Sequence, residues 1–440
     1  MTDCIAIIDI GKTNKKVLLF DTLLNIIYNK SIQFQEIEDD DGYPCDDIEA
    51  IEKWMFSEIR YIQSQEIYNL KALNFSTHGA TVVYLDKEGN RVAPVYNYLK
   101  TLDKLDFKPF YDTYGGVENF SRTTASPAYG MLNSGMQMYW LKYVKPHLWE
   151  KVDTILHYPQ YLSYLFTKKI TTDYTSIGAH TGLWNFDKMD YHEWLNNEQI
   201  QLPKIENNSE AITAVSINGQ NIVVGNGLHD SSASIVPLLK KNKEKFILLS
   251  TGTWIICMNP FSKEKLTLRQ LKKNCLCFMT PDKQQIKSSM RFLGHAHELY
   301  VEALSAYFSV DIDTHKSLKP NKIIIQKTIH TSKTILLPQV VDSGFKVDLE
   351  VLESFSSYEK AYSQLLFEIS YKVIKGVKLI LDKNHNSNKT NFLYLSGGFN
   401  KNKWFIDYIK LLMPHFTLEI SDIKNQSALG AAMLMKKYIC

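Results

Sequence analysis

The sequence lacks the patterns that mark membrane and secreted proteins. No uninterrupted apolar stretch reaches the roughly 20 residues of a membrane-spanning helix, and the first residues, MTDCIAIIDI, show no basic segment ahead of an apolar run. Six cysteines are spread over 440 residues without a CxxC pair, which is unlike a secreted disulfide scaffold. We therefore expect a cytoplasmic protein with no membrane partner.

A strong excess of charge is also missing. Fifty basic and 47 acidic residues leave a formal charge of +3, and the lysines are scattered along the chain, so nucleic acid is not expected as a partner. Hydrophobic residues make up 45% of the sequence, which is typical of a folded protein with a large core. Because 440 residues exceed what one core usually fills, we expect two domains with a cleft between them.

The two common glycine-rich nucleotide loops are absent, since neither G-x-x-x-x-G-K-[ST] nor G-x-G-x-x-G occurs. A polar turn lies near the start of the chain instead, in IIDIGKTNKKVLLFD. The apolar runs at 4–10 and 17–20 predict the strands of an antiparallel hairpin. Glycine N–H groups with nearby hydroxyl and ammonium groups can bind a phosphate, and the residues of this kind are Gly11, Thr13, Asn14 and Lys16. Alone, the turn predicts no more than a hairpin tip.

A second polar turn of this kind lies in the other half of the chain. FILLSTGTWIICMNP has the pattern of a strand, a turn with Thr251, Gly252 and Thr253, and another strand. This similarity indicates a weak internal duplication, and two facing turns could hold a polyphosphate from both sides of a cleft. Asp9, at the end of the first strand, could then bind a hydrated Mg²⁺, which takes only one or two carboxylates.

Asp230 follows a predicted strand and begins a predicted helix in GNGLHDSSAS. Asp is a favoured helix N-cap, and this interpretation suffices for the residue on its own. The functional interpretation is a general base that takes a proton from an attacking hydroxyl. Gly397 and Gly398 end another strand, before a helix expected to start near Asn402. They could leave room for a base and ribose, and a turn that needs positive φ is the simpler interpretation, which is compatible with the first.

Several other elements can be predicted from the pattern of apolar residues. Helical spacing extends from Asp46 to Ile62, and residues 132–166 are expected to be largely helical. LKALNFSTHGATVVYL predicts a second hairpin. The lysine-rich KKNKEK places a domain boundary near residue 239, which gives domains 1–238 and 239–440.

The order of the motifs resembles that of the FGGY family of carbohydrate kinases, within the superfamily of sugar kinases, Hsp70 and actin, over nearly the whole chain. DIGKTNKKVLLFD is similar to the first phosphate motif of the family, and GLHDSSAS to the segment with the catalytic aspartate. STGTW is similar to the second phosphate motif, and LSGGFNKNKW with NQSALGAA to the adenosine region. The resemblance implies an α/β fold of two ribonuclease-H-like domains, of the actin-like ATPase type, around a central cleft.

The resemblance also implies a role for each candidate residue. Asp230 would be the catalytic base and Asp9 the ligand of Mg²⁺. The nucleotide, ATP, would be bound by Gly11, Thr13, Asn14, Lys16, Thr251, Gly252, Thr253, Gly397, Gly398 and Asn402. FSTHGATVVYLDKEGN is similar to the segment whose His-Gly lies beside the sugar, although a polar core histidine explains that pattern nearly as well. The substrate residues implied are His78, Gly79, Tyr98 and His229.

Three positions depart from the family pattern. Lys12 stands where Thr or Ala is usual, and Ile406 where a nucleotide-side glutamine is common. Lys100 replaces an aspartate in APVYNYLKTLD, which alters the sugar-binding pattern. The Tyr-x-Tyr of Tyr96 and Tyr98 is more similar to the rhamnulokinase and fuculokinase branch than to the xylulokinase branch.

The leading expectation is an ATP-dependent kinase acting on a small ketose or deoxyketose, such as rhamnulose, fuculose or xylulose. A sensor of sugar or nucleotide that keeps the fold without catalysis is the alternative, because fold does not fix function. An ATPase that acts through protein partners, as actin and Hsp70 do, is disfavoured by the Asp230 segment, because a kinase needs a base beside its acceptor hydroxyl. The sequence leaves a homodimer open.

Overall fold

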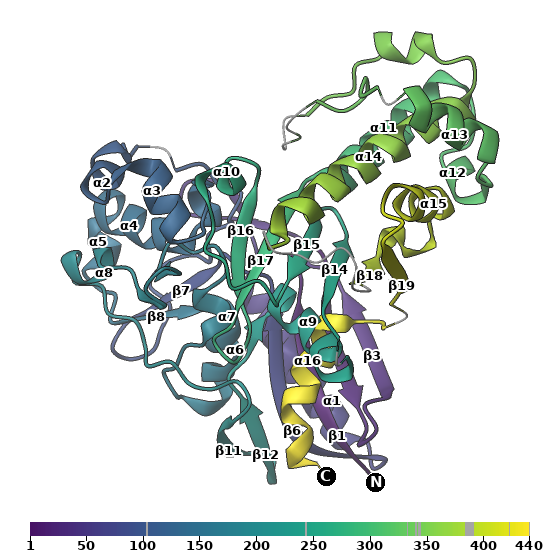
Figure 1. The fold of residues 1–440 in the computed structure, drawn as a ribbon. Helices are drawn as coiled ribbons and strands as arrows, with labels where there is room; N and C mark the ends of the chain where they lie inside the picture. Colours follow the sequence, from purple (N-terminus) through teal and green to yellow (C-terminus); the bar gives the residue numbers. More distant parts are fainter. Residues whose placement is uncertain are drawn as a thin grey trace.

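The structure, a computed structural model, describes residues 1–102, 104–242, 244–331, 333–338, 341, 345–382, 391–421 and 423–439. It consists of two α/β halves, each built on a mixed β-sheet, and the two ends of the chain lie close together beside the first sheet (Figure 1). Among the helices in these ranges, none is both long and apolar enough to cross a membrane.

The first sheet has β1 (Thr2–Ile10) and β6 (Tyr68–Thr77) at its centre. Its order is β11–β12–β6–β1–β2–β3, and β13 also pairs with β6. β1 is antiparallel to β2 and parallel to β6, while β2 is antiparallel to β3 and β12 is parallel to β6. The other strands are β2 (Lys15–Phe20), β3 (Ile26–Ile32), β11 (Ala211–Ile217), β12 (Gln220–Gly225) and β13 (Leu228–His229).

The second sheet repeats this arrangement, with the order β16–β17–β15–β14–β18–β19. β14 is antiparallel to β15 and parallel to β18, β15 is antiparallel to β17, and β18 is parallel to β19. The strands are β14 (Phe246–Thr251), β15 (Ile255–Asn259), β16 (Cys275–Met279), β17 (Gln285–Arg291), β18 (Asn391–Gly397) and β19 (Phe416–Ile420). Five strands of each sheet therefore share one topology, as the internal duplication predicted.

Helices cover both faces of the first sheet. α1 (Ile48–Ser64) and α6 (Tyr158–Thr167) pack on one face, and α9 (Asp230–Lys241) and α16 (Gln426–Met435) on the other. α9 also packs against the second sheet through Ile235 and Leu238, so that it lies between the two sheets. Both faces of this helix are therefore buried, which fixes the position of its first residue, Asp230.

Further helices complete the two halves. The long α14 (Tyr358–Ile380) packs against β15 and β17 of the second sheet. The others are α2 (Lys108–Thr113), α3 (Gly116–Thr123), α4 (Ser134–Val144), α5 (Pro146–Trp149), α7 (Tyr174–Ile177), α8 (Trp194–Asn197), α10 (Leu268–Leu271), α11 (Leu293–Tyr307), α12 (Thr314–Ser317), α13 (Lys322–Thr331) and α15 (Lys403–Leu412). The 3₁₀ turns are η1 (Gly130–Leu132), η2 (Glu350–Ser354), η3 (Gly398–Lys401) and η4 (Lys436–Tyr438).

The hairpin expected at the start of the chain forms, but the second one does not. The first turn is closed by the Gly11 N–H, which donates to the Asn14 carbonyl at 3.0 Å. β7 (Val82–Leu85) pairs with β8 (Thr154–His157) rather than with β6. The stretch 132–166, expected to be largely helical, is interrupted by β8. The four residues of this strand are buried and form a two-stranded sheet with β7. The remaining short strands are β4 (Ile37–Glu38), β5 (Pro44–Cys45), β9 (Trp184–Asn185) and β10 (Asp190–Tyr191).

The last helix, α16, packs on the first sheet although it follows the second sheet in the sequence. Small side chains on its buried face, Ala428, Ala431 and Ala432, contribute to the same core as Ile5 and Ile7 of β1. Gly430 allows the closest approach, since a Cβ atom there would lie 1.9 Å from the Ala233 carbonyl oxygen of α9. The packing of α9 on α16 therefore requires glycine at this position.

We expect Gly430→Ala to lower the free energy of unfolding by about 1–3 kcal/mol, the usual cost of overfilling a packed core. Alanine favours helix more than glycine does, so intrinsic propensity alone would give the opposite sign. Urea denaturation followed by circular dichroism measures the change. An unchanged or increased stability would show that α9 and α16 do not approach as closely as described.

Candidate active site

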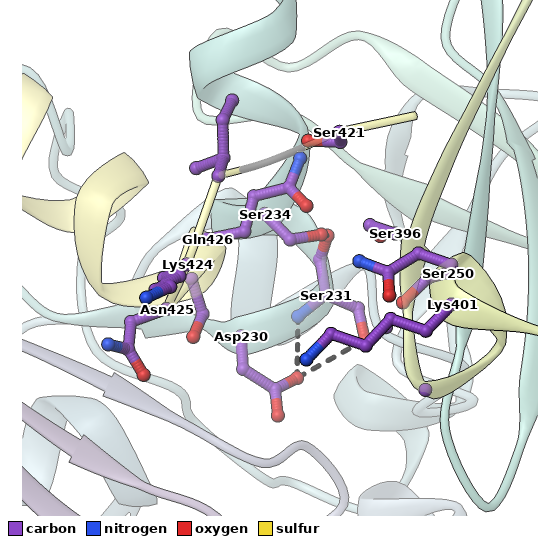
Figure 2. Close-up of a pocket in the computed structure, with 15 residues that line it drawn as sticks. Asp230, Ser231, Ser234, Ser250, Ser396, Lys401, Ser421, Lys424, Asn425 and Gln426 are labelled. Atoms are coloured by element: carbon purple, nitrogen blue, oxygen red, sulfur yellow. Dashed lines mark hydrogen bonds between the residues drawn. The ribbon is translucent and has the colours of Figure 1, made fainter. Parts of the chain in front are cut away.

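A cavity of about 950 Å³ opens between the two halves (Figure 2). One wall is the start of α9, with Asp230, Ser231 and Ser234. Opposite it lie the ends of β14 and β18, the η3 turn, and the segment that leads into α16. Asp230 thus faces residues that come from the other end of the chain, as the labelled side chains in Figure 2 show.

The Asp230 carboxylate is held on one oxygen. Its Oδ1 accepts hydrogen bonds from the Ser231 N–H at 2.5 Å and the Ser231 hydroxyl at 3.2 Å. Burial raises the pKa of Asp230, although a third of the side chain is exposed towards the cavity. His229 Nε2 lies 3.3 Å from Oδ1, but burial lowers the pKa of His229 to about 3. The His229 imidazole is therefore neutral at physiological pH, and the charge of His78 and the hydrogen bonds from Ser231 are what oppose the rise in the pKa of Asp230.

Asp230 does not serve as the N-cap of its helix. α9 begins at Asp230 itself, and His229 occupies the capping position. The carboxylate bonds only to the adjacent residue, Ser231, among the parts of the chain that are described. The N-cap interpretation of this aspartate is therefore wrong, which leaves the side chain available to the cavity.

Asp9 is the last residue but one of β1 and lies beside the same cavity. Its two carboxylate oxygens accept from the hydroxyl of Ser427, which lines the cavity, at 3.3 and 3.2 Å. Burial raises the pKa of Asp9 to about 6, and the negative charge of Asp230 adds to the rise. The two carboxylates are thus neighbours that repel each other, an arrangement that a divalent cation relieves.

The surroundings of Asp9 fit a hard cation such as Mg²⁺. Ser76 pairs with Asp9 in the register of β1 and β6. It is fully buried, and its hydroxyl faces the Asp9 carboxylate, where it acts against the rise in the pKa of Asp9. Oxygen atoms from carboxylates and hydroxyls are the ligands that Mg²⁺ prefers, so Asp9, with Ser76 and Asp230 close by, is a suitable set.

The predicted phosphate residues of the first hairpin lie at its tip and on one face. Lys16 stands opposite Asp9 in the β1–β2 register, and its Nζ donates to Asn425 Oδ1 at 3.0 Å. Thr13 and Asn14 are exposed, and the Asn14 amide oxygen accepts from Gln33. Of the described residues that line the cavity, none belongs to the tip that Gly11 begins. Lys16 therefore reaches the cavity only through Asn425.

The second polar turn lines a separate cavity of about 920 Å³, together with Gly398 and Asn402. The Thr251 hydroxyl donates to the Ser396 carbonyl at 2.5 Å and accepts from the Phe399 N–H at 3.1 Å. This hydroxyl thus joins β14 to η3. The predicted residues on this cavity are Thr251, Gly252, Thr253, Gly398 and Asn402.

Gly397 and Asn402 both have clear local roles. Gly397 has φ = +89°, and a Cβ atom there would lie 2.0 Å from the Thr251 carbonyl oxygen, so only glycine fits. It lines the cavity that contains Asp230. Asn402 caps α15 by accepting from the Phe405 N–H, and its side-chain amide donates to the Tyr362 hydroxyl at 2.8 Å. The glycine pair and the helix start expected near Asn402 both form.

The four predicted substrate residues lie together beside Asp230. A Cβ atom on Gly79 would lie 3.0 Å from the His229 ring, so the two residues are in close contact. The His78 ring packs edge-on against Tyr98, with centroids 5.5 Å apart. With His229 Nε2 at 3.3 Å from Asp230 Oδ1, these contacts place the four residues in one group next to Asp230.

Two residues next to this group were missed by sequence reasoning, Lys15 and Asp46. Lys15 is 2% exposed and donates to Asp46 Oδ1 at 3.1 Å, while Asp46 Oδ2 lies 3.8 Å from His78 Nε2. Burial acts to raise the pKa of Asp46. His78 and Lys15 act in the opposite direction and outweigh burial, so that this pKa is lowered to about 2. Strand alternation was the available signal, since Lys15 and Lys16 must point to opposite faces of β2.

Lys100, the main departure from the family pattern, belongs to a cluster of charges. Its ammonium lies 2.5 Å from Asp39 and 2.6 Å from Asp41, and 4.8 Å from the centre of the Tyr96 ring. Lys145 pairs with Asp41 in the same cluster, at 2.9 Å. The Lys100 charge is thus neutralised by the buried Asp39 and by Asp41. Lys12 is likewise paired, with Glu36 at 2.6 Å.

Comparison with known proteins agrees with the division of the chain into two halves. The N-terminal domain model of the FGGY family of carbohydrate kinases matches residues 4–237, and the FGGY C-terminal domain model matches residues 243–439. The chain is 25% identical over 260 residues to the rhamnulokinase of Yersinia pestis (strain Pestoides F), which is 56% of this chain and 52% of that protein. It thus spans about half the length of that relative.

Two further proteins are similar over longer ranges. The rhamnulokinase of Oceanobacillus iheyensis is 23% identical over 412 residues, 85% of this chain and 84% of that protein. The xylulose kinase of Lactobacillus acidophilus superposes with a TM-score of 0.79 at 16% identity, covering 99% of this chain and 89% of that one. The fold expected from the sequence, two domains of the actin-like ATPase type, is confirmed. Since both family models match in order, the protein belongs to the FGGY family of carbohydrate kinases.

Proposed function

We propose that the protein is an ATP-dependent kinase that phosphorylates a hydroxyl of a small sugar, with Asp230 as general base. The observation that carries the proposal is the pair of neighbouring carboxylates, Asp9 and Asp230, at the edge of the interdomain cavity. A phosphoryl transfer needs a base beside the acceptor and a cation beside the phosphates. This pair can supply both functions from two different elements.

Asp230 would accept the proton of the acceptor hydroxyl as that oxygen forms its bond to the γ-phosphorus and the bond to the ADP oxygen breaks. Ser231 holds Oδ1 in place, so Oδ2 is the oxygen available to take the proton. The raised pKa makes the carboxylate a stronger base than an ordinary aspartate. His229, being neutral, does not weaken that base by ion pairing.

Asp9 would hold Mg²⁺, with Ser76 and Asp230 within its surroundings. When bound, this ion neutralises charge on the phosphate oxygens. Lys16, opposite Asp9 in the hairpin, would direct its ammonium to the phosphates after exchanging its bond to Asn425. The turn Thr251–Thr253 with Gly397, Gly398 and Asn402 would bind the rest of the nucleotide, and Gly11, Thr13 and Asn14 would close over it from the hairpin tip.

The acceptor is proposed to be a ketose or deoxyketose, such as rhamnulose, fuculose or xylulose. His78, Gly79, Tyr98 and His229 would contact it, because they lie together next to Asp230. Two of the similar proteins carry the name rhamnulokinase and one the name xylulose kinase. Lys100 is not included, since its charge is satisfied by Asp39 and Asp41.

A sensor that binds sugar or nucleotide without turnover is the second candidate. It is favoured by the hydrogen bonds that already engage Asp9 with Ser427 and Lys16 with Asn425. An ADP-release assay across ketoses, aldoses and polyols, with Mg²⁺ present, separates the two functions. ATP binding without ADP release for any sugar in a broad panel would support the sensor.

We expect Asp230→Asn to reduce sugar phosphorylation by about 10²–10⁴-fold, the usual contribution of a general base. Asparagine keeps an oxygen that can accept from Ser231, so ATP binding should stay close to that of the parent chain. Ser234→Ala is a suitable control, because Ser234 lines the same cavity from the same helix. Undiminished phosphorylation by Asp230→Asn would remove the base from the mechanism.

We also expect activity to fall as the pH drops below about 6. The pKa of Asp9 is raised to about 6, so acid protonates the residue proposed to hold Mg²⁺. The apparent affinity for Mg²⁺ should then weaken by about tenfold for each pH unit, because one proton competes with the ion. Measuring kcat/KM against Mg²⁺ concentration from pH 5 to 8 tests this. An Mg²⁺ requirement that does not change over that range would contradict the role of Asp9.

A further inference from the structure

The two cavities share only two of the described residues that line them, Gly398 and Lys401. One cavity contains Asp230 and the other contains Thr251–Thr253. Both shared residues belong to η3, the short turn after β18. A molecule that extends from one cavity into the other must therefore pass η3, and Lys401 is the charged residue that it meets there.

The ammonium group of Lys401 is available to bind an anion. Its side chain is exposed, and in the described ranges no ion pair or hydrogen bond involves its ammonium. Figure 2 shows the side chain extending across the cavity from η3 towards the side on which Asp230 lies. Lys16, by comparison, donates to Asn425, and Lys316 pairs with Asp313 at 2.7 Å. An unpaired ammonium at the junction of two cavities is a suitable contact for an anionic group.

We propose that Lys401 binds the β- or γ-phosphate of a nucleoside triphosphate that spans the two cavities. This inference rests on the proposed function, and it gives the donor site a second cation besides Lys16, on the opposite wall of the cavity. The adenosine would occupy the cavity of Thr251–Thr253 and Asn402, and the phosphates would extend past Gly398 towards Asp230. The absence of a side chain on Gly398 leaves room for them beneath the lysine.

The charges on either side of the junction support this orientation of the nucleotide, in which the phosphates extend towards Asp230. Asp230 lines its cavity, and Asp9 lies next to that cavity, bonded to the lining residue Ser427, so the two carboxylates need a cation before a phosphate can approach. Lys401 lies on the opposite wall, and its charge would favour the terminal phosphates over the nucleoside. A lysine that contacts these phosphates should therefore distinguish ATP from AMP, whereas a lysine near the nucleoside should not.

The test compares Lys401→Met with Lys403→Met in the full chain. Lys403 is equally exposed but lines only the cavity of Thr251–Thr253, which makes it a matched control. Dissociation constants for ATP and AMP would be measured by calorimetry at fixed Mg²⁺. We expect Lys401→Met to weaken ATP binding by about tenfold or more, as loss of a charge-assisted hydrogen bond does, with AMP changed by less than about threefold.

Lys401→Arg should restore most of the ATP affinity, because it keeps the charge, and Lys403→Met should affect ATP and AMP alike. ATP binding by Lys401→Met that equals that of the parent chain would overturn the inference, as would an equal loss of ATP and AMP. Failure of the parent chain itself to bind ATP would overturn the proposed function as well. The two failures are therefore distinguishable in one series of titrations.

Discussion

The packing of α16 on the first sheet is the interaction on which the rest of the site depends. Its small residues allow close contact with β1 and α9, and Gly430 permits a separation that any side chain would prevent. This contact places Ser427 against Asp9 and Asn425 against Lys16. The end of the chain therefore completes the environment of a hairpin that lies at its beginning.

α9 provides the second constraint, because it contributes to cores on both sides. Ala233 and Val236 pack with the first sheet, while Ile235 and Leu238 pack with the second. Asp230 at the start of this helix is thus fixed relative to both halves, and burial adjusts its pKa and that of its neighbour Asp9 in the same direction. The geometry and the electrostatics of the carboxylate pair have one common cause, which is their position between two packed sheets.

The sequence predicted the parts of the fold that rest on local periodicity. The hairpin of β1 and β2, the similar hairpin of β14 and β15 and the helix after Asp46 follow from the spacing of apolar residues. Pairing between distant segments was not predictable in this way, so β7 was assigned the wrong partner. Lys15 and Asp46 are brought together by tertiary packing, and Lys401 matters only because two cavities meet beside it.

The most direct test of the account is a crystal structure with Mg²⁺ and a non-hydrolysable ATP analogue. We expect the nucleoside in the cavity of Thr251–Thr253, the phosphates passing over Gly398, and the terminal phosphate beside a cation bound to Asp9. A nucleoside outside that cavity, or a terminal phosphate directed away from Asp9 and Asp230, would contradict it.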